Sequence, residues 1–294
     1  MRGMVFAMVL PACAADATWR EMEVELGVPY ASMVVDGTPL TCLVDTGSAN
    51  DLITRSDLGL PDEVVIDFGE RESEALAVFH PDIDPLFDAL STADRTVDCI
   101  VGWPVFRPHA VTFDYATESW RVSRSGRRAA DLADADLGPA ITVPIFGTLN
   151  WPMASFDVAG TPTTAIVDTG ASFVHLEPVV FDQLDPAPST VPALATTPDG
   201  LVTSRAGRLA TVDLGGAMQD DVWFSTSPLP QVALANDRGV ELDALVGASF
   251  LLHYAVTFDG PRAEVTLQPY ASAVADTLLD DLTADAGVRP LDAI

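Results

Sequence analysis

The chain has 294 residues, 43 acidic and 15 basic side chains, a formal net charge of −28 and 48% hydrophobic residues. This composition is typical of a globular protein and excludes a disordered one. It argues against a nucleic-acid partner, because a phosphate backbone would be repelled. The acidity is equally compatible with secretion, with high salt and with activity in acid.

The first segment, 1–17, predicts a leader. Arg2 precedes the apolar run Met4 to Leu10, and small residues follow. This order is typical of a short signal peptide, and "LPAC", ending at Cys13, is similar to a bacterial lipoprotein box apart from its proline. We therefore expect an exported protein, periplasmic, cell-envelope or extracellular, with membrane anchoring through a lipidated Cys13 as one form. A mis-assigned start or an unstructured tail would produce the same pattern.

The residues after the leader predict strands joined by tight turns. "MEVEL" at 22–26 alternates, and "ASMVV" at 31–35 is connected by the turn residues "DGTP" to "LTCLV" at 40–44. "AVTFD" at 110–114 and "WRVS" at 120–123 predict a later hairpin. Helical patterns are sparse, and we expect only a turn after Val101-Gly102 and after Val246-Gly247, and a helix at "PVVFDQL", 178–184.

The same strand pattern occurs twice. At a shift of 123, residues 28–47, "VPYASMVVDGTPLTCLVDTG", align with 151–170, "WPMASFDVAGTPTTAIVDTG", and 12 of the 20 positions are identical. At a shift of 145, "DCIVGWPVFRPHAVTFD" at 98–114 aligns with "DALVGASFLLHYAVTFD" at 243–259. The chain therefore contains two copies of one unit, and the second has 22 extra residues (145 − 123) between these alignments.

The repeat divides the chain into segments. A polar stretch between the copies is typical of a linker. The expected segments are the leader 1–17, an N-terminal lobe 18–122, a linker 123–140, a C-terminal lobe 141–270 and an acidic tail 271–294 that is compatible with a helix.

Each copy contains an Asp turn, which is Asp-Thr-Gly behind two apolar residues: 45–47 and 168–170. A single such turn is most simply a surface turn. Two matched turns behind buried strands favour another interpretation, since a carboxylate at the end of a buried strand is costly unless it is partnered. A pseudo-twofold relation between the copies would bring Asp45 and Asp168 together.

Each Asp turn is followed downstream by a Val-Gly motif, Ile100-Val101-Gly102 or Leu245-Val246-Gly247. Over about 230 residues, this pattern resembles the pepsin and retropepsin family of aspartic proteases. The resemblance implies an all-β fold: a bilobal pepsin-like acid protease with two homologous retropepsin-like β-barrel lobes and pseudo-twofold symmetry. The Asp-to-Gly spans of 57 (102 − 45) and 79 (247 − 168) residues are nearer to a retroviral-type protomer, so the chain resembles two fused retropepsin units.

The resemblance implies an aspartic endopeptidase, acting as a monomer on peptide or protein substrates, with Asp45 and Asp168 as catalytic residues. Two carboxylates about 3 Å apart cannot both ionise and therefore share one proton. The ionised carboxylate acts as a base on water, and the protonated one donates to the scissile carbonyl. We expect no metal and no other cofactor.

The residues that follow each Asp have supporting roles. Thr46 and Thr169 resemble the hydroxyl lock of the family, and Gly47 and Gly170 allow a close approach of the backbone.

The fourth position of the turn differs between the copies. Ser48 could hydrogen-bond the Asp45 carboxylate, whereas Ala171 cannot do so for Asp168, so we expect Asp45 to ionise more readily. A water molecule in the second copy would remove this difference.

The family closes its cleft with β-hairpin flaps, and each copy offers one candidate. These are 64–79, with a turn near Gly69, and 194–212, with turns at Asp199-Gly200 and Ala206-Gly207. A counterpart of the pepsin flap tyrosine is missing, because no Tyr lies between the first Asp turn and its Val-Gly motif.

Two cysteines lie at matched positions of the first copy. Cys42 lies three residues before the Asp of the first Asp turn, and Cys99 lies three residues before the Gly of the first Val-Gly motif. Ala165 and Ala244 replace them in the second copy. Because both positions carry a smaller residue in the second copy, we expect their side chains to face each other. We therefore predict that the two cysteines are neighbours, and that they are disulfide-bonded if the protein is exported. Two separate buried thiols are the alternative.

Three other interpretations remain open. The fold could bind peptides or act as an inhibitor without cleaving, although both Asp turns are intact. The catalytic pair could form between chains, although the covalent duplication makes this unnecessary. "HPDID" at 80–84 could hold a cation, but acidic loops more often face water.

Overall fold

The computed structural model describes residues 18–68, 73–81, 83–123, 137–146, 150–197 and 200–285. The fold is mostly β, as predicted, with three sheets of eight, seven and six strands. The leader 1–17, Cys13 and most of the predicted linker lie outside the described residues. Within the described ranges, no helix has the length and apolar character needed to cross a membrane.

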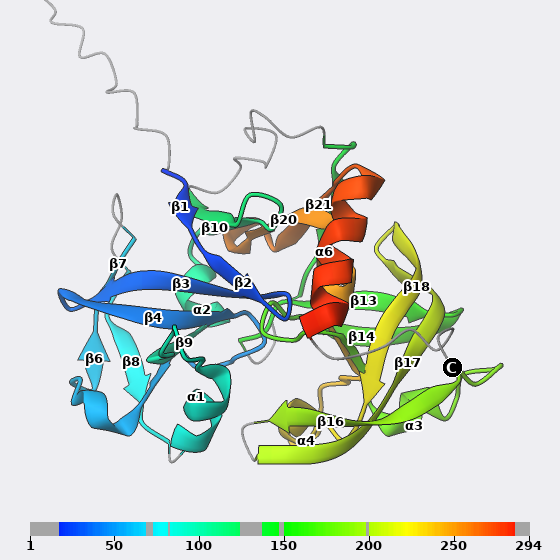
Figure 1. Ribbon diagram of the computed structural model, residues 1–294, viewed down its shortest axis with the longest axis horizontal. Helices are drawn as coiled ribbons and strands as arrows, with labels where there is room; N and C mark the ends of the chain where they lie inside the picture. Colours follow the sequence, from blue (N-terminus) through cyan, green and yellow to red (C-terminus); the bar gives the residue numbers. More distant parts are fainter. Residues whose placement is uncertain are drawn as a thin grey trace, which may run out of the picture.

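The eight-stranded sheet is built from the first copy (blue to cyan in Figure 1). Its order is β2-β3-β4-β9-β5-β8-β6, and β7 pairs with β3. The predicted hairpin is formed by β3 and β4, and its turn residues Asp36 and Gly37 have positive φ angles of 46° and 79°. The strands are β2 Glu23–Glu25, β3 Val28–Val35, β4 Thr38–Asp45, β5 Leu52–Thr54, β6 Glu63–Val64, β7 Ile66–Asp67, β8 Leu76–Phe79 and β9 Cys99–Gly102.

The seven-stranded sheet is built from the second copy (green to yellow in Figure 1). Its order is β13-β14-β19-β15-β18-β17-β16, with an additional pairing between β13 and β17. The hairpin of β13 and β14 turns at Ala159 and Gly160, again with positive φ angles, of 51° and 85°. The strands are β13 Met153–Val158, β14 Thr161–Val167, β15 Val174–Leu176, β16 Thr190–Thr197, β17 Gly200–Leu214, β18 Ala217–Thr226 and β19 Ala244–Val246.

The six-stranded sheet joins the two copies and lies above the other sheets in Figure 1. Its order is β1-β11-β10-β20-β21-β12. The two "AVTFD" segments lie at its centre, where Thr112 and Thr257 face each other with their hydroxyl oxygens 3.0 Å apart. The strands are β1 Arg20–Glu21, β10 Ala110–Asp114, β11 Ser119–Ser123, β12 Ile141–Pro144, β20 Tyr254–Asp259 and β21 Glu264–Pro269.

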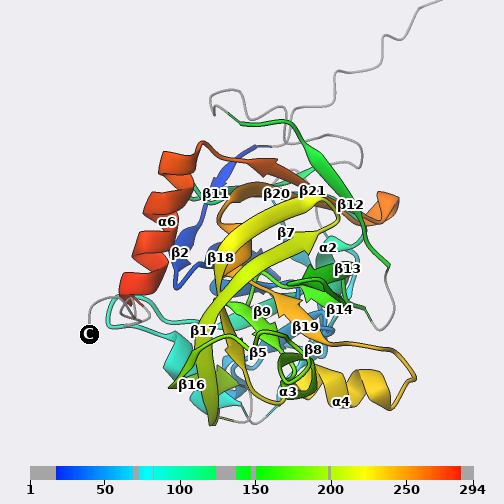
Figure 2. The ribbon, with the colours of Figure 1, turned by 90° about the vertical axis from the view of Figure 1, so that its right-hand side faces the viewer.

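Short helices cover the sheets. Those after the Val-Gly motifs and at the start of 178–184 were predicted, whereas α1 and α4 were not. Helix α6 occupies part of the predicted tail, lies beside β2 and β11 in Figure 2, and buries Leu282 against the turn at Gly27. The helices are α1 Asp84–Leu90, α2 Trp103–Phe106, α3 Pro178–Phe181, α4 Pro230–Asn236, α5 Ala248–Leu251 and α6 Ser272–Asp285.

A continuous hydrophobic core connects all three sheets, and two smaller clusters flank it. Helix α1 contributes Phe87 to one small cluster, and α4 contributes Ala235 to the other. Five positions of one cluster correspond to five of the other at the shifts of 123 and 145. They are Val28, Tyr30, Leu43, Val97 and Ile100 in the first cluster, and Trp151, Met153, Ile166, Leu242 and Leu245 in the second. Helices α1 and α4 therefore cover equivalent faces of the two copies.

Candidate active site

The Val-Gly motifs lie directly beside the strands that end in the Asp turns. Strand β9 runs parallel to β4 and antiparallel to β5, which places Val101 opposite Val44. Strand β19 has the same relation to β14 and β15, and places Val246 opposite Val167. All four valines are fully buried. The apolar pairs thus hold each Asp turn at the end of a strand that is buried on both sides.

The two Asp turns are tied to each other by reciprocal hydrogen bonds of their threonines. The Thr46 hydroxyl donates to the Val167 carbonyl at 2.7 Å, and the Thr169 hydroxyl donates to the Val44 carbonyl at 2.6 Å. Each hydroxyl also accepts the backbone N–H of the other threonine, at 3.1 and 3.0 Å. Both side chains are 1% exposed, so these bonds are shielded from water.

The threonine bonds bring the side chains of Asp45 and Asp168 into hydrogen-bond contact with each other. The Gly47 N–H donates to Asp45 Oδ1 at 2.8 Å and to Asp168 Oδ1 at 3.1 Å, and the Gly170 N–H donates to Asp168 Oδ1 at 2.8 Å. A Cβ atom on Gly47 would lie 2.2 Å from Asp168 Oδ2, and one on Gly170 would lie 2.5 Å from Asp45 Oδ1. Only glycine therefore fits at the third position of either turn.

Burial raises the pKa of both carboxyl groups. The pKa of Asp45 lies well above its ordinary value of 3.8, because burial and then the charge of Asp168 disfavour ionisation more than the N–H groups of Gly47 and Ser48 favour it. For Asp168, the hydrogen bond from Asp45 and three backbone N–H groups oppose the rise of the pKa that burial causes. The two carboxyl groups therefore share one proton, and their titration belongs to the pair.

The expectation that Asp45 ionises more readily depended on a hydrogen bond from the Ser48 hydroxyl. The Ser48 hydroxyl accepts the N–H of Asn50 at 3.4 Å, and it is the backbone N–H of Ser48, not its side chain, that favours the Asp45 carboxylate. The N–H of Ala171 acts in the same way on Asp168. The side chain at the fourth position of the turn therefore does not decide which carboxyl group ionises.

The threonine bonds support a stability prediction. Thr169→Val keeps the side-chain shape but leaves the Val44 carbonyl and the Thr46 N–H buried without these partners, so we expect the free energy of unfolding to fall by about 2–4 kcal/mol. Thr169→Ser keeps the hydroxyl and should lose only about 1 kcal/mol, for one buried methyl group. Urea denaturation of the two variants measures the difference. Equal midpoints would show that the hydroxyl does not hold the turns together.

The candidate flap of the second copy is a long hairpin of β16 and β17, in which Thr197 pairs with Gly200. The expected turn at Ala206-Gly207 is wrong, because both residues lie inside β17, where Gly207 pairs with Thr190. A Cβ atom on Gly207 would lie 2.3 Å from the Ser189 carbonyl oxygen, so this glycine permits a close approach of two strands and not a turn.

The hairpin and the candidate flap of the first copy differ in their surroundings. Strand β16 lies near helix α1 of the first copy. In the segment 64–79, by contrast, Val64, Ile66 and Leu76 are buried in the main core. Gly69, the expected turn of that segment, lies outside the described residues.

Cys42 and Cys99 are joined by a disulfide bond. They lie opposite each other on the parallel strands β4 and β9, with Cα atoms 4.5 Å apart. Ala165 and Ala244 occupy the same pairing on β14 and β19.

In "HPDID", the His80 ring forms a hydrogen bond with the Thr54 hydroxyl at 2.8 Å. The described residues contain no group of three or more His, Cys, Asp or Glu arranged to hold a metal ion.

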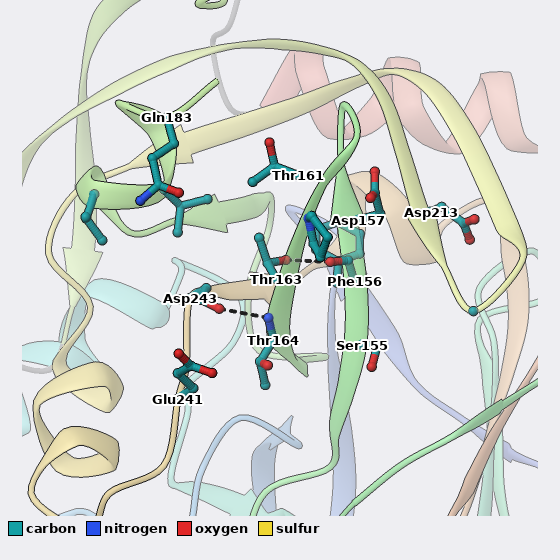
Figure 3. A pocket seen from close by; sticks show the side chains of 14 residues that line it. Ser155, Phe156, Asp157, Thr161, Thr163, Thr164, Gln183, Asp213, Glu241 and Asp243 are labelled. Atoms are coloured by element: carbon teal, nitrogen blue, oxygen red, sulfur yellow. Dashed lines mark hydrogen bonds between the residues drawn. The ribbon is translucent and has the colours of Figure 1, made fainter. Parts of the chain in front are cut away.

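A cavity of about 600 Å³ lies along β13 and β14 (Figure 3), and no residue of either Asp turn lines it. Three of its carboxylates are engaged by nearby backbone: Asp243 accepts the N–H of Thr164, and Asp157 and Asp213 accept N–H groups of the turns that follow them. These carboxylates stabilise local backbone structure, so this cavity does not explain the chemistry of the Asp turns.

A second cavity, of about 520 Å³, lies next to the first Asp turn. Residues 49–51, which continue from that turn, form one wall. The other lining residues are Ala77, Phe79, Asn150, Leu234 and Arg238. No sequence signal identifies this set, because its members are single residues from distant segments that only the folded chain brings together.

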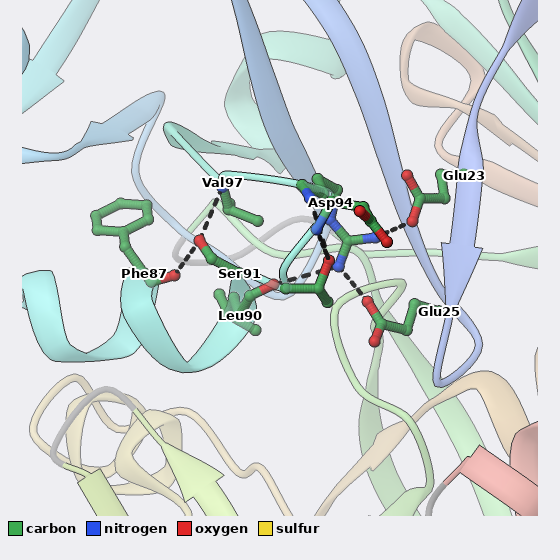
Figure 4. Close-up of polar contacts among 9 residues, drawn as sticks. Glu23, Glu25, Phe87, Leu90, Ser91, Asp94 and Val97 are labelled. Carbon is green, nitrogen blue, oxygen red and sulfur yellow. Dashed lines mark hydrogen bonds and ion pairs between the residues drawn. The ribbon is translucent and has the colours of Figure 1, made fainter.

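The buried side chain of Arg95 lies in a polar cluster with Glu23, Glu25 and Leu90, three residues that Figure 4 labels. The Arg95 guanidinium pairs with Glu23 and Glu25, donates to the Leu90 carbonyl, and stacks 3.7 Å from the centre of the Tyr30 ring. These contacts attach the segment between α1 and β9 to β2 and β3. The cluster is therefore structural, and it fixes the position of the strand that carries the first Val-Gly motif.

Two neighbouring Asp carboxyl groups that share one proton are a feature of aspartic proteases. Residues 154–250 match the family model described as aspartyl protease, which supports a hydrolase of the protease type. The match covers 97 of the 294 residues (250 − 154 + 1) and includes the second Asp turn and its Val-Gly motif. No match was found among curated protein sequences.

Proposed function

We propose that the protein is an aspartic endopeptidase that hydrolyses peptide bonds with a water molecule activated by Asp45 and Asp168. The contact between the two carboxyl groups, of which Asp168 is buried and Asp45 half-buried, is the observation that carries the proposal. A carboxyl pair placed there only for stability would be unfavourable, because burial and mutual repulsion both oppose its ionisation.

We assign the roles from the larger rise of the pKa of Asp45. The Asp168 carboxylate takes a proton from water as the water oxygen attacks the carbonyl carbon, and the Asp45 carboxyl group donates its proton to the carbonyl oxygen. The tetrahedral intermediate then breaks its C–N bond as the leaving nitrogen takes up the proton held by Asp168. The hydroxyl group of the intermediate returns the other proton to Asp45, which restores the starting state.

The architecture included in this proposal is two fused retropepsin-like lobes, 18–122 and 141–270, related by pseudo-twofold symmetry. The repeated sequence, the repeated pairing of each Asp-turn strand with a Val-Gly strand, and the two equivalent small clusters support it.

We further propose that the protein is exported and acts as a monomer on peptides or proteins. The disulfide bond supports export, since disulfides persist mainly in oxidising compartments. Cleavage of the leader and lipidation of Cys13 belong to this proposal. A non-catalytic peptide-binding or inhibitor-like protein is the second candidate function, and the intact pair of Asp turns favours the protease over it.

The test is cleavage of a mixed peptide library between pH 3 and 7, with and without pepstatin. The wild type should cleave and pepstatin should inhibit it. Asp45→Asn should be inactive, and Asp57→Asn, at an exposed carboxylate, should behave as the wild type. Cleavage that survives Asp45→Asn would contradict the mechanism, and peptide binding without cleavage at any pH would favour the second candidate.

A further inference from the structure

The cavity of about 520 Å³ is lined by the residues that follow the first Asp turn and has the size of a small-ligand pocket. Ala49, Asn50 and Asp51 follow that turn directly, and Ala49 also packs against the small cluster of the second copy. The opposite wall comes from residues after β12 and from α4 and the segment that follows it. The cavity thus has walls from both copies, and one wall begins two residues after Gly47.

The walls combine apolar surface with positive charge. Phe79 and Leu234 are 44% and 41% exposed and supply the apolar part. Arg238 lines the cavity, and Arg107 donates to the Oδ1 atom of the lining residue Asn150 at 3.1 Å. Among the described residues, neither arginine pairs with a carboxylate, in a chain with 43 acidic and 15 basic residues.

The one carboxylate in the cavity wall is already engaged. Asp51 accepts the N–H of Ala77 through Oδ2 at 3.0 Å, and it forms no salt bridge with Arg238. Because an arginine left unpaired in so acidic a protein is available to an incoming anion, the cavity favours a carboxylate ligand.

We propose that this cavity is a specificity subsite that binds an acidic side chain of the peptide substrate, with Arg238 as its direct partner and Arg107 at its rim. The inference rests on the proposed protease function and names its substrate class: peptides with Glu or Asp beside the scissile bond, the stem of the acidic residue packing on Phe79 and Leu234.

The experiment compares peptides that carry Glu, Gln or Lys at a single position, scanned along both sides of the scissile bond. Measurements at pH 5–6 keep Glu ionised. At one position, the wild type should prefer Glu over Gln by about tenfold in kcat/KM, as expected for a charge-assisted hydrogen bond. Arg238→Gln should abolish this preference. Arg262→Gln, a change at a surface arginine paired with Asp259 and Glu264, should retain it.

A binding measurement with Asp45→Asn separates this inference from the proposed function. If the wild type cleaves but never prefers Glu, prefers Lys, or keeps its Glu preference in Arg238→Gln, the subsite is overturned and the protease remains. If no peptide is cleaved but Asp45→Asn binds Glu peptides more tightly than Gln peptides, in a manner that requires Arg238, the protease is overturned and the subsite remains.

Discussion

Asp45→Asn is expected to abolish peptide cleavage and, at the same time, to stabilise the protein at neutral pH. The asparagine amide has the shape of a protonated carboxyl group and can donate to Asp168, so the contact across the pair is kept. The variant no longer has a proton for the carbonyl oxygen, and we expect kcat/KM to fall by at least about a thousandfold, the scale of losing a positioned acid.

The gain in stability follows from the sign of the pKa shift. Because the pKa of Asp45 is raised in the folded protein, the folded state retains protons that the unfolded chain releases near pH 3.8. The contribution of this group to the free energy of unfolding of the wild type is fully present below that pH. It is lost as the pH rises toward and through the raised pKa of Asp45. The difference in Tm, variant minus wild type, should therefore grow from pH 4 to pH 7.

Asp168→Asn is the matched comparison. Its backbone N–H partners favour a charged oxygen, so this substitution should stabilise the protein less than Asp45→Asn, although it should be equally inactive. Thermal unfolding of the three proteins across this pH range gives the answer. A larger gain for Asp168→Asn would place the shared proton on Asp168 and exchange the two catalytic roles.

Removal of the disulfide should produce the second large effect. The bond closes a loop with a sequence separation of 57 residues, for which loop-closure entropy predicts a contribution of about 4 kcal/mol to the free energy of unfolding. The double variant Cys42→Ala, Cys99→Ala should lose about this amount, measured by guanidinium denaturation. Alanine fits these positions, since Ala165 and Ala244 occupy the equivalent pairing in the second copy.

The wild type with its disulfide reduced is the control for this variant, because it loses the same bond without a change of side chain. Below the unfolding transition, both forms should cleave at the wild-type rate, since β4 and β9 remain paired through their backbones. A double variant as stable as the oxidised wild type would show that the bond does not constrain the unfolded chain. Loss of cleavage in the folded variant would show that the bond positions Asp45.

The strand pattern was predictable where short-range chemistry determines it. The hairpins β3–β4 and β13–β14 form because alternating residues flank a pair of turn residues that adopt positive φ angles. The hairpins β10–β11 and β20–β21, which contain the "AVTFD" segments, have the same cause. Helices α1 and α4 were missed, because each has only seven residues and is stabilised mainly by packing on its small cluster. The turn assigned at Gly207 was wrong for a related reason: a glycine that permits a close contact has the same sequence signature as a turn glycine.

The sequence by itself determined the duplication and the positions of both Asp turns, because the same pattern of strands and turns occurs in both copies. This repetition also supported the expectation that the two turns meet. Only the tertiary structure decided the finer chemistry. Which carboxyl group holds the proton depends on the directions of individual N–H groups, and the arginine-lined cavity depends on residues from distant segments. Both are consequences of packing between the copies, which no local pattern encodes.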